Sequence, residues 1–250
     1  MIGNPHINVN MEEGKVLAEY ANNADGTPKD AFTASETPHT DAKGDKYIVK
    51  THNDDEDAIL AIGKIGDIYG GGNLATVEGD TYVDIGTGSW YNYETKQIET
   101  ITRNAATITG NVYGGGKGEA AVTGADAFTC AKAMIGKVDS GKGSTNVIIG
   151  NGTVGTIEND ILKAGTGNVY GGGEIGRVES NTSVTIGLEG NTENNITIMG
   201  NVYGAGQGVE THGYSGLTRG NSTVVVQGKA KVLGSVYGGG EMASVGAFWV

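Results

Sequence analysis

The sequence predicts an all-β fold, a parallel β-helix, or β-solenoid, of about five to six coils with loop insertions. Three observations predict it. A glycine-rich phrase recurs five times, an alternating β-branched segment follows each of the first four copies, and a short strand-like segment precedes the copies. A phrase repeated at one phase indicates units that bury their hydrophobic faces only by stacking on their neighbours.

The recurring phrase reads Gly, then Asn, Asp or Ser, then Val or Ile, then Tyr, then Gly-Gly/Ala-Gly, as in GNVYGAG at 200–206. The tyrosines of the five copies are Tyr69, Tyr113, Tyr170, Tyr203 and Tyr237. Their spacings are 44, 57, 33 and 34 residues, so the short spacing indicates the basic coil and the longer ones indicate insertions. Glycine and asparagine tolerate left-handed backbone, so we expect the first two residues to turn a corner.

The second phrase, Thr/Ser-x-Val-x-Ile/Val, occupies residues 81–85, 145–149, 182–186 and 222–226. Its alternation of β-branched residues is typical of a strand with one buried face. A third strand precedes the glycine phrase, most clearly at 196–198 and 231–233. Coils of three such strands would stack at about 4.8 Å and place like residues in ladders. An antiparallel sandwich would not require the same corner five times. We expect a right-handed solenoid, because right-handed is the common hand of parallel crossovers.

Two ladders follow from this arrangement. If Val202 faces the core, Tyr203 faces outward, because neighbouring residues on a strand alternate. The tyrosines would then form an aromatic ladder. The residues at the second position of the phrase would form a polar one, made of Asp67, Asn111, Asn168, Asn201 and Ser235.

We expect a single β-helix domain over 1–250, with regular coils at 58–250 and a polar insertion or loop at 11–57. Further excursions are expected at 86–106, 117–143 and 207–220. Both ends of the sequence match the middle of a coil, which predicts a segment of a longer array, although Phe248 and Trp249 could also cap a natural end. Long loops on a rigid stack commonly carry variable binding surface.

Composition excludes several partners. The chain has 29 acidic and 17 basic residues and a formal charge of -12, which argues against nucleic acid because phosphate binding needs clustered Lys and Arg. Its single cysteine, Cys130, excludes an intrachain disulfide. No signal peptide is visible, and no apolar stretch approaches the roughly 20 residues of a membrane span, so direct membrane insertion is not expected.

The glycine phrase does not predict a phosphate site. Phosphate and dinucleotide loops open a helix, whereas no helical segment and no Gly-Lys-Ser/Thr accompanies any of the five copies. The four histidines lack metal-ligand spacing. We therefore predict no cofactor and no metal.

Two sets of aromatic residues are the binding candidates. The five tyrosines could offer a stacking platform for sugars, or they could be packed away. Trp90, Tyr91 and Tyr93 lie close together in one insertion, where they could anchor a partner or fold back on the solenoid. An enzymatic alternative would use Glu174 and Glu241, which would lie two coils apart, at about 9.6 Å, near the upper limit for an inverting carboxylate pair. Both belong to the column of residues that directly follows the five glycine phrases and otherwise has the mixed charges of a solvated edge; its members are Asn73, Lys117, Glu174, Gln207 and Glu241.

GNVYGGG followed by a TxVxIG strand, repeated over most of residues 60–246, resembles the repeats of very large secreted surface proteins of gut bacteria. The resemblance implies an adhesin-like β-helix that is extracellular or attached to the cell surface, with no catalytic residues carried over. We therefore expect a non-enzymatic structural element that displays loops and ladders to a glycan, protein or cell surface. Self-association, end to end or side by side, is compatible with such a stack. A carbohydrate-active β-helix enzyme, a polysaccharide lyase or glycoside hydrolase, is the alternative.

Overall fold

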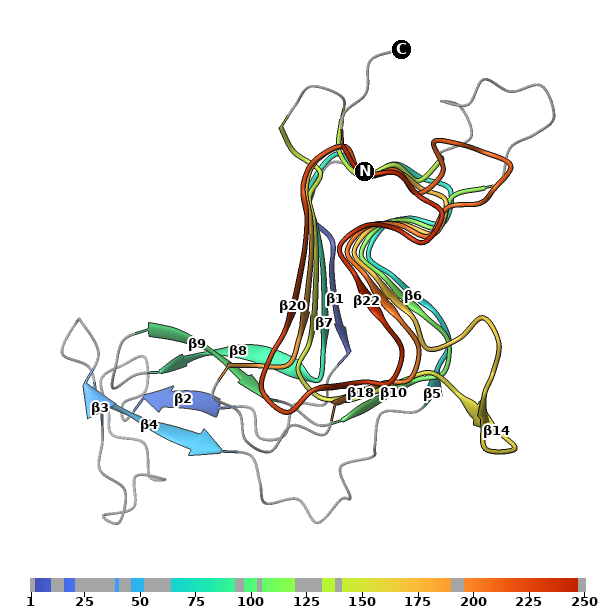
Figure 1. Cartoon of the computed structure of the whole chain (residues 1–250). Coiled ribbons are helices and arrows are strands. Elements are labelled where there is room, and N and C mark those ends of the chain that lie inside the picture. Colours follow the sequence, from blue (N-terminus) through green and yellow to red (C-terminus); the bar gives the residue numbers. More distant parts are fainter. Residues whose placement is uncertain are drawn as a thin grey trace. The chain divides into compact units, whose positions relative to one another are not determined.

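The computed structural model describes residues 3–9, 16–20, 39–40, 46–51, 64–92, 97–102, 105–119, 132–137, 141–189 and 196–246 (Figure 1). The chain forms two compact units. The larger unit comprises 1–10, 61–88 and 101–250, and the smaller comprises 11–60 and 89–100.

Three parallel five-stranded sheets build the larger unit (Figure 1). The first sheet contains β1 (His6–Val9), β7 (Thr81–Ile85), β12 (Thr145–Ile149), β17 (Thr182–Ile186) and β20 (Ser222–Val226). The second sheet contains β5 (Lys64–Ile65), β10 (Ala106–Ile108), β13 (Gly152–Val154), β18 (Ile196–Ile198) and β21 (Lys231–Val232). The third sheet contains β6 (Ile68–Tyr69), β11 (Val112–Tyr113), β16 (Val169–Tyr170), β19 (Val202–Tyr203) and β22 (Val236–Tyr237).

The chain visits the sheets in a fixed order, second, third and then first, before it moves up by one strand. We number the coils one to five by the glycine phrases, each of which carries one strand of the third sheet. Equivalent residues pair without slippage, so Tyr113 lies opposite both Tyr69 and Tyr170. This register confirms the predicted parallel solenoid, and its handedness stays a prediction.

The core is formed by the inward-facing residues of all three sheets. β7, β12 and β17 alternate between buried and partly buried positions, and Val83, Val147 and Val184 are at most 1 % exposed. Residues of the third sheet join the same cluster through Val112, Val169 and Val202. The predicted inward orientation of the valine before each inner tyrosine is thereby confirmed.

A smaller cluster stabilises the bend between the third and first sheets. Val77, Ile135 and Val178 pack there and are linked from coil to coil by single β-bridges. Nearby, the Glu179 carboxylate lies 2.6 Å from Arg177 Nε and 3.2 Å from Arg219 Nη1. Because the Glu179 side chain is buried, these two guanidinium groups compensate a charge that would otherwise destabilise the bend.

The corner glycines owe their presence to close packing rather than to left-handed backbone, which corrects the expectation from sequence. Of the five first glycines of the phrase, only Gly167 has a positive φ, 88°, and no following Asn, Asp or Ser does. A Cβ on Gly110 would instead lie 2.2 Å from Asp67 Oδ1, and one on Gly200 would lie 2.5 Å from Asn168 Oδ1. The side chain of one coil therefore occupies the space that a side chain on the next coil would need.

The predicted polar ladder is confirmed, and it is a hydrogen-bonded one. Asp67 Oδ1 accepts a hydrogen bond from the backbone N–H of Asn111 at 2.8 Å, and Asn111 Oδ1 accepts one from Asn168 at 2.9 Å. Asn168 and Asn201 continue the series at 2.8 Å toward coils four and five. Each coil thus satisfies a backbone donor of the next coil at the corner, where sheet hydrogen bonds end.

The smaller unit contains a three-stranded antiparallel sheet of β2 (Val16–Tyr20), β4 (Lys46–Thr51) and β3 (His39–Thr40). The segment 11–57, expected as a polar insertion or loop, therefore contains strands. Within the insertion at 86–106, β8 (Thr87–Asn92) pairs with β9 (Gln97–Thr102).

Gly171 and Gly238 provide a matched test of the close-packing argument, since both occupy the same position of the phrase. A Cβ on Gly171 would lie 2.1 Å from the carbonyl oxygen of Gly204, whereas a Cβ on Gly238 would meet nothing within 4 Å. We expect Gly171→Ala to destabilise the protein by about 1–3 kcal/mol. Urea denaturation should show a clearly lower midpoint for Gly171→Ala and an almost unchanged one for Gly238→Ala. Equal effects of the two variants would contradict the argument.

Candidate functional site

The five phrase tyrosines form a continuous stack along the third sheet. Successive ring centroids are 4.8 to 5.0 Å apart and neighbouring ring planes lie within 9° of parallel. This separation equals the usual distance between paired strands. Because each tyrosine pairs with the equivalent tyrosine of the next coil, the register of the sheet places the rings on top of one another. Tyr113, Tyr170 and Tyr203 are buried, and the terminal Tyr237 is 46 % exposed.

The tyrosine hydroxyls are held by the column of side chains that follows the glycines. Tyr69 donates a hydrogen bond to Glu174 Oε2, Tyr113 donates to Gln207 Oε1 at 2.8 Å, and Tyr170 donates to Glu241 Oε2 at 2.7 Å. In all three cases the acceptor belongs to the coil two positions further along the stack. The column is therefore more than the solvated edge expected from its mixed charges.

Burial and these contacts raise the pKa values of the stacked phenols. For Tyr69 and Tyr170, desolvation by burial is the main cause, and the hydrogen bond to a glutamate carboxylate adds to it. For Tyr113, desolvation raises the pKa and the nearby Glu174 charge adds to it. The phenols consequently remain protonated and serve as hydrogen-bond donors well above neutral pH.

A hairpin on coil three, between β13 and β16, extends beside the start of this ladder. It consists of β14 (Ile157–Glu158) and β15 (Ile161–Leu162), which pair antiparallel. The turn residues Asn159 and Asp160 have φ values of 52° and 64°, as a two-residue type I′ turn requires. The segment that follows the hairpin is tied to the polar ladder, because Asn111 Nδ2 donates a hydrogen bond to the Gly165 carbonyl at 2.8 Å.

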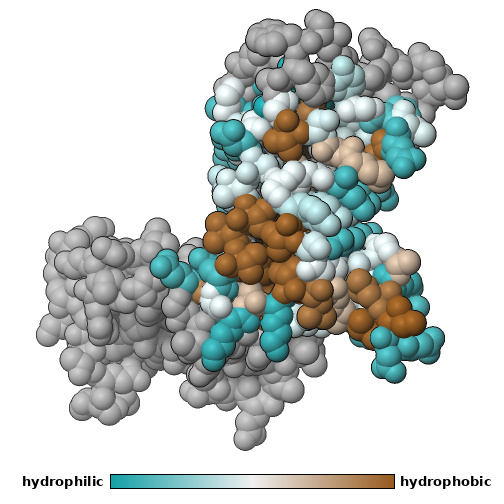
Figure 2. Space-filling model, viewed as in Figure 1, coloured by the Kyte–Doolittle hydropathy of each residue, from teal (hydrophilic) through white to brown (hydrophobic). Residues whose placement is uncertain are grey.

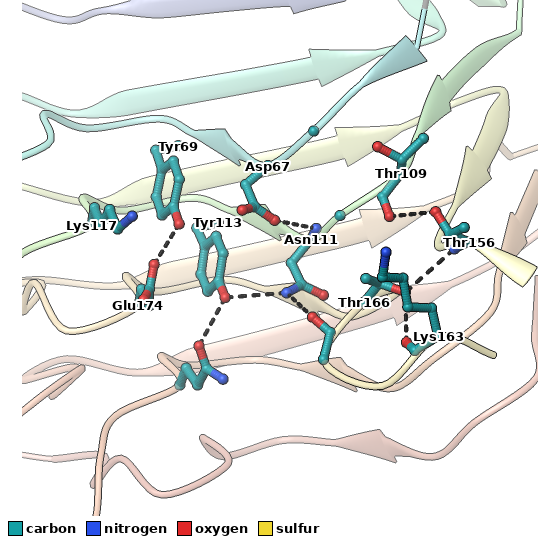
Figure 3. A pocket seen from close by; sticks show the side chains of 14 residues that line it. Asp67, Tyr69, Thr109, Asn111, Tyr113, Lys117, Thr156, Lys163, Thr166 and Glu174 are labelled. Carbon is teal, nitrogen blue, oxygen red and sulfur yellow. Dashed lines mark hydrogen bonds between the residues drawn. The ribbon is translucent and has the colours of Figure 1, made fainter. Parts of the chain in front are cut away.

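A pocket of about 540 Å³ lies between the ladder and the hairpin (Figure 3). Its lining includes Asp67, Tyr69, Asn111, Lys117, Lys163 and Glu174. Lys117 Nζ lies 5.9 Å from the centroid of the Tyr69 ring, within the range of a cation–π contact. The pocket thus combines two ammonium groups, two carboxylates, the side-chain amides of Asn111 and Gln207, and phenol edges, which are groups that hydrogen-bond a hydroxyl-rich ligand.

Only some of the aromatic residues predicted to bind a ligand line the pocket. Tyr69 and Tyr113 line the pocket, whereas Tyr170 and Tyr203 are buried in the stack. Trp90 and Tyr91 belong to strand β8, but their side chains lie outside the described residues, as does Tyr93 entirely. The pocket therefore forms without any described contribution from this aromatic insertion.

Two features of the site were not predicted from the sequence. One is the hairpin, and the other is the hydrogen bonding of the tyrosine hydroxyls to the column side chains. The hairpin was not among the predicted excursions, although Asn159-Asp160 between isoleucine-containing segments is a recognisable turn signal. No sequence pattern indicates that the Tyr69, Tyr113 and Tyr170 hydroxyls bond to residues two coils away. These bonds depend on how far the column side chains extend along the solenoid axis.

Comparison with protein-family models, curated proteins and solved structures gives no match to this chain. Among the residues that the structure describes, no three His, Cys, Asp or Glu side chains are grouped as metal ligands would be. The described part of the chain also contains no helix long and apolar enough to cross a membrane.

The hydroxyl of Tyr170 should contribute measurably to stability. Tyr170→Phe removes its hydrogen bond to Glu241 and leaves the stacking intact. We expect a loss of about 1 kcal/mol, since the acceptor is charged but solvent-exposed. Tyr237→Phe is the control, because the Tyr237 hydroxyl makes no hydrogen bond among the described residues. Equal urea midpoints for the two variants in dilute solution would argue against the ladder bond.

Stability should also depend on alkaline pH. The folded chain holds phenolic protons that the unfolded chain releases above the ordinary tyrosine pKa of 10.0. The stabilisation is therefore complete below pH 10 and declines above it, by about 1.4 kcal/mol per pH unit for each proton retained. Urea midpoints measured between about pH 8 and pH 11 should stay constant and then fall. Tyr69→Phe/Tyr170→Phe should show a shallower decline, and a flat profile in the parent chain would refute the assignment.

Proposed function

We propose that this chain is a non-enzymatic, adhesin-like surface element whose solenoid presents a carbohydrate-binding pocket beside the tyrosine ladder. Its role would be to hold a glycan on a stiff stack of coils. The extracellular or cell-surface location belongs to the same proposal and rests on the resemblance of the repeats.

The observation that carries the proposal is the composition of the pocket. Sugars are recognised by convergent hydrogen-bonding side chains together with aromatic surface. Asp67, Lys117 and Lys163 supply charged donors and acceptors, and Tyr69 and Tyr113 supply phenol groups. Two lysines and two carboxylates line the pocket, and Lys163 also pairs with Glu158 at 3.0 Å, so the pocket has no surplus of positive charge. This balance favours a hydroxyl-rich ligand over a strongly anionic one.

The rigidity of the surroundings supports binding without large rearrangement. The Asp67 carboxylate already accepts a hydrogen bond from the Asn111 N–H, and Asn111 Nδ2 in turn donates one to Gly165, in the segment that follows the hairpin. A pocket whose walls are tied by hydrogen bonds before binding loses less conformational entropy when a ligand enters.

A carbohydrate-active enzyme remains the alternative, because Asp67 and Glu174 line the same pocket. Two carboxylates flanking a sugar are the usual requirement for glycoside hydrolysis. Against this, Glu174 accepts the Tyr69 hydroxyl hydrogen bond and Asp67 Oδ1 accepts the Asn111 backbone N–H. Both carboxylates are thus engaged in supporting the coils.

A printed array of neutral and acidic oligosaccharides would test the proposal directly. We expect binding to at least one class of glycan, with no new reducing ends or unsaturated products after prolonged incubation. Product formation would replace the proposal with the enzymatic alternative, and failure to bind any glycan would contradict both.

Variants would locate the binding on the protein. Lys117→Ala/Lys163→Ala removes both pocket ammonium groups and should weaken binding of the array ligand about tenfold, the equivalent of losing about 1.4 kcal/mol. Lys132→Ala is the matched control, because Lys132 is an exposed lysine that pairs with Glu119 away from the pocket. Isothermal titration calorimetry gives the affinities. An unchanged affinity in the double variant would place the site elsewhere.

A further inference from the structure

Two of the stacked tyrosines donate their hydroxyl hydrogen to a carboxylate. Tyr69 donates to Glu174 Oε2, and Tyr170 donates to Glu241 Oε2 at 2.7 Å. A phenol that loses an electron becomes a strong acid, so its oxidation is easiest where a base lies within hydrogen-bond reach of the hydroxyl. The stack therefore contains two phenols whose proton acceptor is already in place.

The tyrosines on either side of Tyr170 lack such a base among the described residues. Tyr113 donates to the side-chain oxygen of Gln207, and the Tyr203 hydroxyl accepts a hydrogen bond from Asn201 Nδ2 at 3.1 Å. An amide oxygen is a far weaker base than a carboxylate, so the proton of an oxidised Tyr113 or Tyr203 has no comparable destination. An electron vacancy in this part of the stack is consequently lower in energy on Tyr170 than on either neighbour.

The rings are arranged for electron exchange. Tyr113 lies between Tyr69 and Tyr170, with ring centroids 4.8 Å from each and ring planes within 3° of parallel. This separation is in the range of stacked aromatic pairs, whose π systems are in contact. An electron removed from Tyr69 is therefore replaceable from Tyr170 through Tyr113.

The pocket gives a solvent-borne oxidant access to the first two rings and not to the third. Tyr69 and Tyr113 line the pocket, whereas Tyr170 is 0 % exposed. Figure 2 shows hydrophobic surface on the neighbouring hairpin, where Ile157 and Ile161 are 47 and 70 % exposed, but neither residue lines the pocket. Because the lining is polar and the chain carries a formal charge of -12, a hydrophilic, cationic oxidant approaches most readily.

We propose that the tyrosine stack accepts a one-electron oxidation at the pocket and holds it on Tyr170. A cationic, oxidised metal complex takes one electron from Tyr69 and leaves in its reduced form. While it is oxidised, Tyr69 shares its proton with Glu174, and it regains the proton when one electron arrives from Tyr170 through Tyr113. The O–H bond of Tyr170 then breaks, and its proton forms an O–H bond with Glu241 Oε2. The product is a neutral tyrosyl radical beside a protonated carboxyl group.

The position of Tyr170 inside the stack preserves this radical. Free tyrosyl radicals decay mainly when two of them form a bond between their rings. The Tyr170 ring lies between those of Tyr113 and Tyr203, at 4.8 and 5.0 Å, and so meets no radical of a second molecule. The stack thus stores one oxidising equivalent beside the pocket. This activity does not depend on glycan binding, so either proposal can fail without the other.

Flash photolysis with ruthenium tris(bipyridine) and a sacrificial electron acceptor would test the proposal, because it generates a cationic ruthenium(III) oxidant in the sample. We expect a tyrosyl radical, identified by electron paramagnetic resonance, that persists after the radicals of free tyrosine under the same conditions have decayed. Tyr170→Phe keeps the stacked ring and should lose the persistent signal. A parent chain without a persistent signal would overturn the proposal.

Carboxylate variants locate the vacancy. Glu241→Gln keeps a hydrogen-bond acceptor for the Tyr170 hydroxyl but removes the base, so we expect loss of the persistent signal, which a purely structural contact would not cause. Glu119→Gln is the matched control and should behave as the parent chain, because Glu119 pairs with Lys132. Far-UV circular dichroism checks that each variant is folded. A signal lost in Glu174→Gln and kept in Glu241→Gln would place the vacancy on Tyr69 and contradict the assignment.

The route through the stack has its own test. Tyr113→Phe preserves a stacked ring between Tyr69 and Tyr170, but phenylalanine is much harder to oxidise than tyrosine. The yield of the persistent radical per flash should therefore fall in this variant. An unchanged yield would refute the relay.

Discussion

The in-register pairing of equivalent residues in neighbouring coils is the constraint on which the rest of this structure depends. Each strand of the third sheet lies opposite its own counterpart, Tyr113 against Tyr69 and Tyr170. Because strand spacing is fixed by backbone hydrogen bonds, like side chains must either interact favourably at that spacing or be absent. Tyrosines stack, asparagines bond to the next backbone N–H, and β-branched residues fill the core. All three types of ladder place side chains that interact favourably at the spacing between neighbouring strands.

The same constraint explains the excess of glycine. Where two coils run side by side through a bend, there is no pleat to direct side chains apart, and a Cβ on Gly171 would overlap the Gly204 carbonyl. Glycine is needed there because the next coil is too close, and a left-handed φ is exceptional at these positions. The phrase that resembles a phosphate loop is therefore a packing motif between coils.

Interactions that span two coils give the stack its polarity. The column side chains lean along the axis, so Glu174 reaches Tyr69 and Glu241 reaches Tyr170. The same lean brings Glu174 to Tyr69 among the residues that line the pocket beside the hairpin, where the proposed glycan would be held.

The sequence by itself determined the coil. Five copies of the glycine phrase and four of the Thr-x-Val-x-Ile strand predict the parallel sheets, the inward valines and both ladders, because these features repeat locally in every unit. Only the tertiary structure decided the reason for the corner glycines, the partners of the tyrosine hydroxyls and the pocket walls. The hairpin of Ile157–Glu158 and Ile161–Leu162 approaches Asn111 across more than 40 residues, and Tyr69 meets Glu174 across 105. Such contacts depend on the length of the side chains and on the direction in which they extend between coils. The repeat pattern predicts neither.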